Sequence, residues 1–259
     1  MAKRIKQKVI RLFLTVGVFL AAGFGTTGQC GESMKRVLLS AMDWKPVYGP
    51  SLPEGGVFTA LTREAFQRSG YIFEIAFVPW ARAVEMARVG QYDGVMGAMM
   101  TPGRRRSFTA SEMIMPLEVY LFSRAEETIT YEALDDLKGF SIGVIAGSAS
   151  AEMLGTAGLR LQRVGTFDQN LRKLIQGRID LMEGEKYAMA ELLNKYPEYR
   201  DRIKRVNPPI TVSPLYVIIS MANPDHLLIV ADFNRGLREM RADGTFDAII
   251  RRHGFDRLQ

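Results

Sequence analysis

The chain has 259 residues, of which 47% are hydrophobic and 24% are charged. These proportions are typical of a globular protein with one large core or two medium-sized cores, and they exclude a disordered chain. The formal net charge is +6 at pH 7, and where this charge lies decides whether nucleic acid is a plausible partner.

The excess positive charge lies at the N-terminus. The first 30 residues carry five basic side chains and no acidic one, followed by an apolar run over 12–24 and small residues up to Gly28. This order predicts a secretory signal peptide over 1–30, because an apolar run of this length falls short of the roughly 20 residues that span a bilayer. Without the segment the net charge is +1. We therefore expect a periplasmic protein that does not bind nucleic acid.

The only cysteine, Cys30, stands at the border of this segment. A lipid anchor at Cys30 is not expected, because Gln29 occupies a position where lipoprotein processing requires a small residue. A single cysteine also excludes an internal disulfide.

Past the predicted signal peptide, short apolar runs alternate with helical periods. The first part predicts strands over 36–41, 72–78 and 94–99 and helices over 56–69 and 81–89. The second part predicts strands over 117–123, 141–145, 161–164 and 179–182, and helices over 134–138, from 151, and over 168–175. Two such βαβαβ units predict two α/β lobes with parallel sheets, and a ligand site in the cleft at the carboxyl ends of the strands.

The C-terminal part predicts one more strand over 216–221 and a helix pair over 224–252 that breaks at 242–244. Pro208 and Pro209 form the strongest linker signal in the chain, just before that strand.

The segment 79–111 contains an aromatic-led helix, an apolar strand and then the turn Thr101-Pro-Gly-Arg104. An arginine held just beyond a strand, opposite Trp80, would present a cation and an aromatic wall to a small anionic ligand. We expect the neighbouring Arg105 and Arg106 to be solvated. The segment indicates binding rather than catalysis.

Six short motifs follow one another in a recognisable order. They are Trp44-Lys-Pro46, Gln91-Tyr-Asp93-Gly, Thr101-Pro-Gly-Arg104, Gly143-Val-Ile-Ala-Gly147-Ser148, Gly177-Arg-Ile-Asp180 and Asp243-Gly-Thr-Phe246. In this order, over residues 35–256, the chain resembles the family 3 extracellular solute-binding proteins, which serve ABC importers of polar amino acids. The pattern P-W-x-R at 79–82 is similar to that of a divergent branch.

The resemblance implies a two-lobed α/β fold of the periplasmic-binding-protein type II, whose lobes are joined by two hinge strands. Lobe 1 would comprise 34–115 and 217–259, and lobe 2 would comprise 116–216. The expected function is capture of a small carboxylate-bearing ligand, most simply a polar amino acid, by a monomer that delivers it to the membrane permease of an ABC importer. No cofactor or metal is implied.

The resemblance also implies roles for residues of the carboxylate site. Arg104 would clamp the ligand carboxylate with two parallel hydrogen bonds, and Thr101 would support it. Ser148, which opens a helix, would complete the site with backbone amides. The alternative for Ser148 is a simple N-cap.

Glu185 stands at the position where relatives bind the ligand ammonium group with Asp, and the alternative is an exposed carboxylate in a turn. Trp44 and Trp80 would flank the ligand, although both could instead be core residues. Arg82 would either face the cleft or pair with Glu85.

The strand that contains Met96, Met99 and Met100 lacks the hydroxyl residues of relatives, which indicates a less polar ligand. No metal-binding or nucleophile motif occurs, and His226 and His253 lie outside the cleft motifs. Two alternative functions follow from the family: a periplasmic sensor partner of a signalling protein, or a cyclohexadienyl-type dehydratase with Glu185 as its proton-transfer group.

Overall fold

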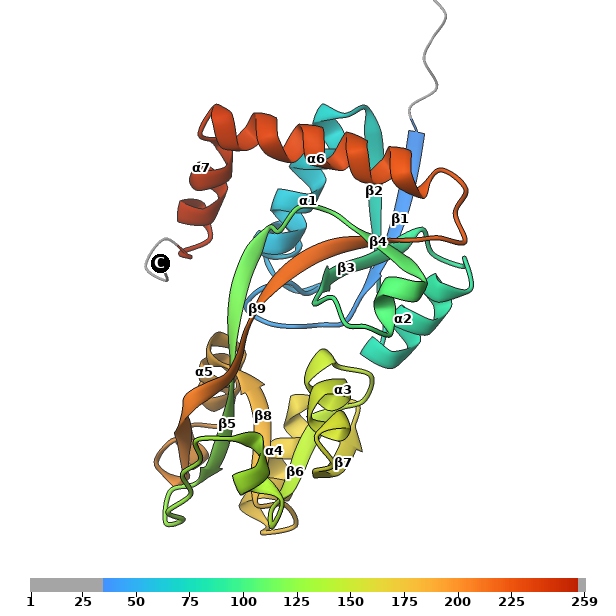
Figure 1. The fold of residues 1–259 in the computed structure, drawn as a ribbon. Helices are drawn as coiled ribbons and strands as arrows, with labels where there is room; N and C mark the ends of the chain where they lie inside the picture. The colour runs from blue at the N-terminus through green and yellow to red at the C-terminus, as the bar shows by residue number, and fades with distance from the viewer. Residues whose placement is uncertain (1–34, 256–259) are drawn as a thin grey trace, which may run out of the picture. The chain divides into compact units, whose positions relative to one another are not determined.

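The computed structural model describes residues 35–255, so the predicted signal peptide and Cys30 lie outside the described residues. Within this range no helix is long and apolar enough to cross a membrane. The elements form two lobes that are linked by two long strands (Figure 1).

Lobe 1 alternates strands and helices as the apolar runs predict. Its strands are β1 (Lys35–Ala41), β2 (Tyr71–Phe77), β3 (Gly94–Ala98) and β4 (Phe108–Ala110), and its helices are α1 (Val57–Arg68), α2 (Trp80–Arg88), α6 (His226–Ala242) and α7 (Thr245–Arg252). Strand β1 pairs in parallel with both β2 and β3. The carboxyl ends of β1 and β3 therefore point in the same direction.

Lobe 2 repeats this plan. Its strands are β6 (Ser141–Ile145), β7 (Arg160–Val164) and β8 (Leu181–Glu185), and its helices are α3 (Ala149–Thr156), α4 (Phe167–Ile175) and α5 (Lys186–Lys195). Strand β6 pairs in parallel with β7 and β8. The described part of the chain also contains four short 3-10 helices: η1 (Pro53–Gly55), η2 (Arg104–Arg106), η3 (Leu134–Leu137) and η4 (Pro197–Arg202).

Two antiparallel strands, β5 (Met115–Arg124) and β9 (Ile203–Ser220), belong to both lobes. The strand order is β2-β1-β3-β9-β5-β8-β6-β7, with β4 paired to β9 beside this path. These two strands are the hinge that the two-lobed fold requires.

Strand β9 is much longer than the predicted strand over 216–221. The prolines predicted as a linker lie inside it, where the pairing with β5 jumps from Thr211 opposite Val119 to Val206 opposite Leu121. Proline lacks an amide hydrogen and is tolerated in a strand at such an irregularity. The linker interpretation was therefore wrong.

Strand β8 also departs from the prediction. It begins at Leu181 and continues through Glu183 to Glu185, whereas the predicted strand ends at residue 182. All five of its residues are buried, because β8 lies between β5 and β6. The strand was predicted too short because glutamates are unusual in a buried central strand. Helix α5, which follows β8, was not predicted.

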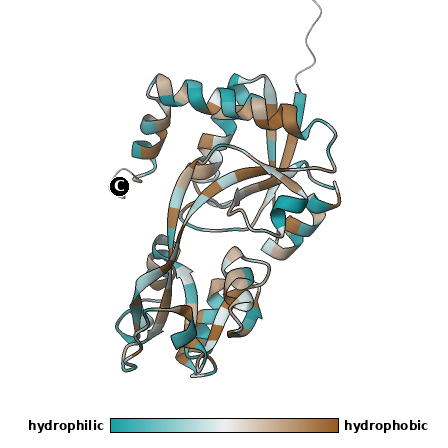
Figure 2. Cartoon of the chain, viewed as in Figure 1, coloured by the Kyte–Doolittle hydropathy of each residue, from teal (hydrophilic) through white to brown (hydrophobic). Residues whose placement is uncertain are grey.

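Each lobe has its own apolar cores. In lobe 1 the largest cluster includes Phe58, Phe66 and Phe233, and in lobe 2 one cluster includes Leu121 and Ile142. Helix α6 is amphipathic, with alternating hydrophobic and hydrophilic residues in Figure 2. Its apolar side packs on α1.

The contact between α6 and α1 is close at Gly236. A Cβ atom at this position would lie 2.0 Å from the carbonyl oxygen of Ala65. Because this neighbour is backbone, the two helices would have to move apart.

We predict that Gly236→Ala lowers the free energy of unfolding by about 1 to 3 kcal/mol, since overpacking costs this much in a tight core. Urea unfolding followed by circular dichroism measures the change. Gly139→Ala is the matched control, because a Cβ at Gly139 has no neighbour within 4 Å. Equal stability of the two variants would contradict the packing argument.

Candidate functional site

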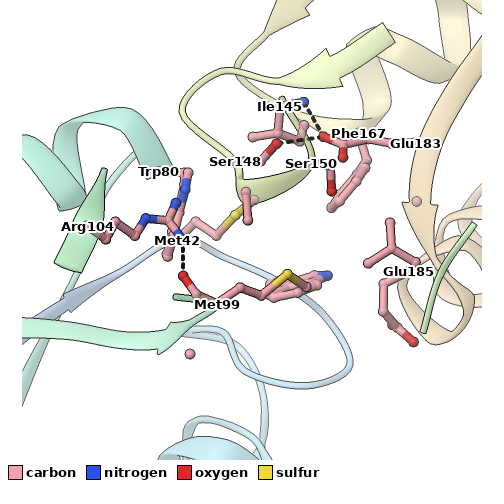
Figure 3. A pocket seen from close by; sticks show the side chains of 15 residues that line it. Met42, Trp80, Met99, Arg104, Ile145, Ser148, Ser150, Phe167, Glu183 and Glu185 are labelled. Carbon is pink, nitrogen blue, oxygen red and sulfur yellow. Dashed lines mark hydrogen bonds between the residues drawn. The ribbon is translucent and has the colours of Figure 1, made fainter. Parts of the chain in front are cut away.

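A cavity of about 60 Å³ lies between the two lobes. It is bordered by the segments that follow β1, β3 and β6, and by the end of β8, so it occupies the carboxyl edge of both sheets. Its walls are mostly apolar and include Val119. Met42, Met99, Ile145 and Phe167 also belong to these walls (Figure 3). The described residues contain no cluster that would hold a metal ion.

Arg104 reaches this cavity from the turn after β3. Its side chain is buried, whereas Arg105 and Arg106 are exposed as expected. The guanidinium donates one hydrogen bond to the carbonyl of Met99 and another, of 2.8 Å, to the carbonyl of Gly147. Burial lowers the pKa of Arg104 to about 10, so the group remains charged at neutral pH.

Trp80 is the first residue of α2 and supports Arg104. The guanidinium carbon lies 5.1 Å from the centroid of the Trp80 ring, within the range of a cation–π contact. The indole Nε1 donates a 2.9 Å hydrogen bond to the carbonyl of Gly147. Two side chains of lobe 1 thus bind the same carbonyl of lobe 2.

Trp44 forms another part of the wall. Its ring packs edge-on against Tyr48, with 5.6 Å between the ring centroids. The indole Nε1 is buried and has no hydrogen-bond partner within the part of the chain that the structure describes. A ligand acceptor would satisfy this donor.

Ser148 lines the cavity and caps α3. Its hydroxyl accepts a hydrogen bond from the amide of Ala151 and donates one of 2.9 Å to Oε1 of Glu183. The amide of Ile145 donates to the same oxygen at 2.6 Å (Figure 3). The Ile145 amide at the end of β6 and the Ser148 hydroxyl in the turn that follows therefore bind the carboxylate of Glu183.

Glu185 ends β8 and caps α5. Its Oε2 accepts hydrogen bonds from the amides of Tyr187 and Ala188, each 3.0 Å long. Its Oε1 is buried without a partner among residues 35–255. Burial raises the pKa of Glu185 to about 7. The alternative interpretation, an exposed carboxylate in a turn, was wrong because the residue is 1% exposed.

Thr101 does not line this cavity. It is buried, its hydroxyl accepts a 3.2 Å hydrogen bond from the amide of Arg104, and it borders an adjoining cavity of about 320 Å³. Arg82 lies exposed on α2, and Glu85 pairs with Arg88 instead.

Sequence reasoning missed Glu183, Met42 and Phe167 as cavity residues. Glu183 stands two positions before Glu185, so the two side chains share one face of a strand. That alternation was the available signal, and it was missed because the predicted strand ends at residue 182.

The family model of bacterial extracellular solute-binding proteins, family 3, matches residues 54–256. The chain belongs to this family. It has the two-lobed periplasmic-binding-protein fold, as the sequence motifs implied. No curated protein matches the chain by sequence.

Several solved structures share the fold of this family 3 protein. A histidine kinase sensor domain similar to periplasmic binding proteins is 18% identical with a TM-score of 0.74, and the match covers 85% of this chain and 96% of that one. An ancestral arginine-binding protein bound to arginine is 20% identical with a TM-score of 0.72, covering 85% and 99%. The GluR0 ligand-binding core from Nostoc punctiforme, in complex with L-glutamate, is 16% identical with a TM-score of 0.70, covering 85% and 99%.

We predict that Glu185 makes this family 3 protein less stable as the pH rises from 4.5 to 7. In this window the unfolded state releases the Glu185 proton, whereas the folded state, with its raised pKa, retains it. Above pH 7, ionisation of the buried Glu185 lowers the free energy of unfolding by roughly 3 kcal/mol, a value that follows from the size of the pKa difference.

Glu185→Gln should therefore flatten the pH dependence between these limits. Urea unfolding at pH 4.5, 5.5 and 7.5 measures the free energy of unfolding of each protein. Glu191→Gln is the control, because Glu191 is exposed on α5, the helix that Glu185 caps. An unchanged slope in Glu185→Gln would show that its carboxyl is not the group responsible.

Proposed function

We propose that the chain is a periplasmic solute-binding protein, a monomer that captures a small carboxylate-bearing ligand, most simply a polar amino acid, and delivers it to the permease of an ABC importer. One observation carries this proposal. A buried guanidinium from lobe 1 and a buried carboxylate oxygen without a partner from lobe 2, those of Arg104 and Glu185, border the same cavity.

An amino acid carries the complementary pair of charges. Its carboxylate would accept from Arg104, which has five N–H donors and uses two of them for Met99 and Gly147. Its ammonium group would donate to Oε1 of Glu185. Both groups are desolvated already, so a ligand that pairs them gains the full charge-assisted interaction.

The walls suit the rest of such a ligand. Trp44 and Trp80 are flat and rigid, so they contact an apolar chain at low entropy cost. Met42 and Met99 add adaptable apolar surface. Thr101 and Ser148 act indirectly in this proposal: Thr101 orders the Arg104 turn, and Ser148 holds Glu183.

Movement at the hinge would allow the ligand to enter the cavity. Strands β5 and β9 connect lobes that contribute opposite walls, so rotation about them opens and closes the cavity. A sensor role is a second candidate, because the histidine kinase sensor domain has the same fold. Both functions require the same capture step, and neighbouring genes for a permease and an ATPase would favour transport.

We predict that Arg104→Lys weakens binding at least tenfold. A lysine keeps the charge but cannot form two parallel hydrogen bonds to a carboxylate. A thermal-shift screen with the twenty amino acids identifies ligands, since binding to the folded state raises its stability, and calorimetry then measures their dissociation constants.

Arg106→Lys is the matched control, as Arg106 is exposed two residues further on. Melting temperatures of both variants show whether they are folded. Unchanged affinity in a folded Arg104→Lys protein would refute the proposed carboxylate site.

A further inference from the structure

The cavity contains two carboxylates and one guanidinium. Glu183 and Glu185 lie two residues apart on β8, so their side chains project from the same face. They are 3% and 1% exposed, respectively, and both border the cavity. Among residues 35–255, Arg104 is the only basic residue in the cavity wall. With all three groups ionised the wall carries one net negative charge.

Neutral groups hold Glu183 in place. Its Oε1 accepts from the amide of Ile145 and the hydroxyl of Ser148. No salt bridge reaches Glu183 or Glu185 within residues 35–255. The adjacent Lys186 pairs with Glu118 instead. Both cavity carboxylates therefore lack a cation from the described part of the chain.

Burying a carboxylate without a counter-charge is costly. Burial accordingly raises the pKa of Glu183 as well as that of Glu185. A ligand cation at each carboxylate would provide the missing charge partner and favour the ionised form of that carboxylate.

Glu183 also changes what the turn after β6 can bind. The amide of Ile145 and the hydroxyl of Ser148 would otherwise be donors for an anion. With the Glu183 carboxylate against them, a ligand anion at this point would meet a like charge. Arg104 is then the cationic group of the described wall with which a ligand carboxylate would pair.

We propose that Glu183 and Glu185 together select a ligand with two cationic groups and one carboxylate, that is, an amino acid with a basic side chain. This inference rests on the proposed function, which provides the carboxylate for Arg104 and the ammonium for Glu185. Glu183 receives the second cation. The aliphatic part of the side chain lies against apolar walls such as Met99 and Phe167. The charges of ligand and site are then equal and opposite.

Calorimetry on the wild-type protein tests the ligand class with matched pairs. Arginine is compared with citrulline, and lysine with norleucine, because each pair has a similar length and differs in side-chain charge. Glutamate is the acidic comparison. We expect the basic member of at least one pair to bind at least tenfold more tightly than its neutral partner. We expect glutamate to bind more weakly than both members of that pair.

The variant Glu183→Gln tests the residue. A glutamine keeps an oxygen that accepts from Ile145 and Ser148 but removes the charge. We expect it to weaken binding of the preferred basic amino acid at least tenfold, and that of the neutral partner less than threefold. Glu191→Gln removes an exposed charge from α5, so it should change the affinity for neither the basic amino acid nor its neutral partner.

The outcomes separate the two proposals. If a neutral or acidic amino acid binds as tightly as the basic ones, or if Glu183→Gln weakens both members of a pair equally, the basic-ligand inference is wrong and amino-acid capture stands. If no amino acid binds, both proposals fail. The wild-type comparison requires no variant, so it decides the ligand class even where Glu183→Gln does not fold.

Discussion

The site depends on one carbonyl group, that of Gly147. Two side chains of lobe 1, those of Trp80 and Arg104, both donate hydrogen bonds to it from across the cavity. Gly147 has a φ of +76°, and a Cβ there would lie 3.3 Å from Cα of Ala81, so a residue with a side chain would be strained and crowded. This close approach holds the turn of lobe 2 against α2 of lobe 1, and it holds the guanidinium at the cavity.

The charged groups of the cavity wall are buried, and each is stabilised by neutral neighbours. Arg104 is stabilised by carbonyl oxygens and an aromatic face rather than by a carboxylate, and the carboxylates of lobe 2 are stabilised by amides and hydroxyls rather than by a cation. Opposite charges thus border one cavity without neutralising each other. Structures of the same fold include proteins bound to arginine and to glutamate, so the fold by itself does not determine which ligand is bound.

Much of the fold was predictable because it depends on local patterns. Strand β6 was predicted with its observed bounds, and β1, α1 and α2 within one residue at each end, since apolar periodicity and a buried face coincide there. The errors occur where local chemistry opposes tertiary position. Three prolines, Pro208, Pro209 and Pro214, stand within β9, and two glutamates lie in the buried strand β8. Both combinations are locally unfavourable for a strand.

The sequence by itself determined the alternation of strands and helices, the family, and the turn that carries Arg104. All of these rest on residues close together in the chain. Only the tertiary structure decided that Glu185 is buried, that Ser148 serves Glu183, and that Thr101 stands outside the cavity. The physical reason is that the desolvation of a charge and the partner of a hydroxyl depend on residues distant in sequence. For Glu183, these are Ile145 and Ser148 on the neighbouring strand and turn.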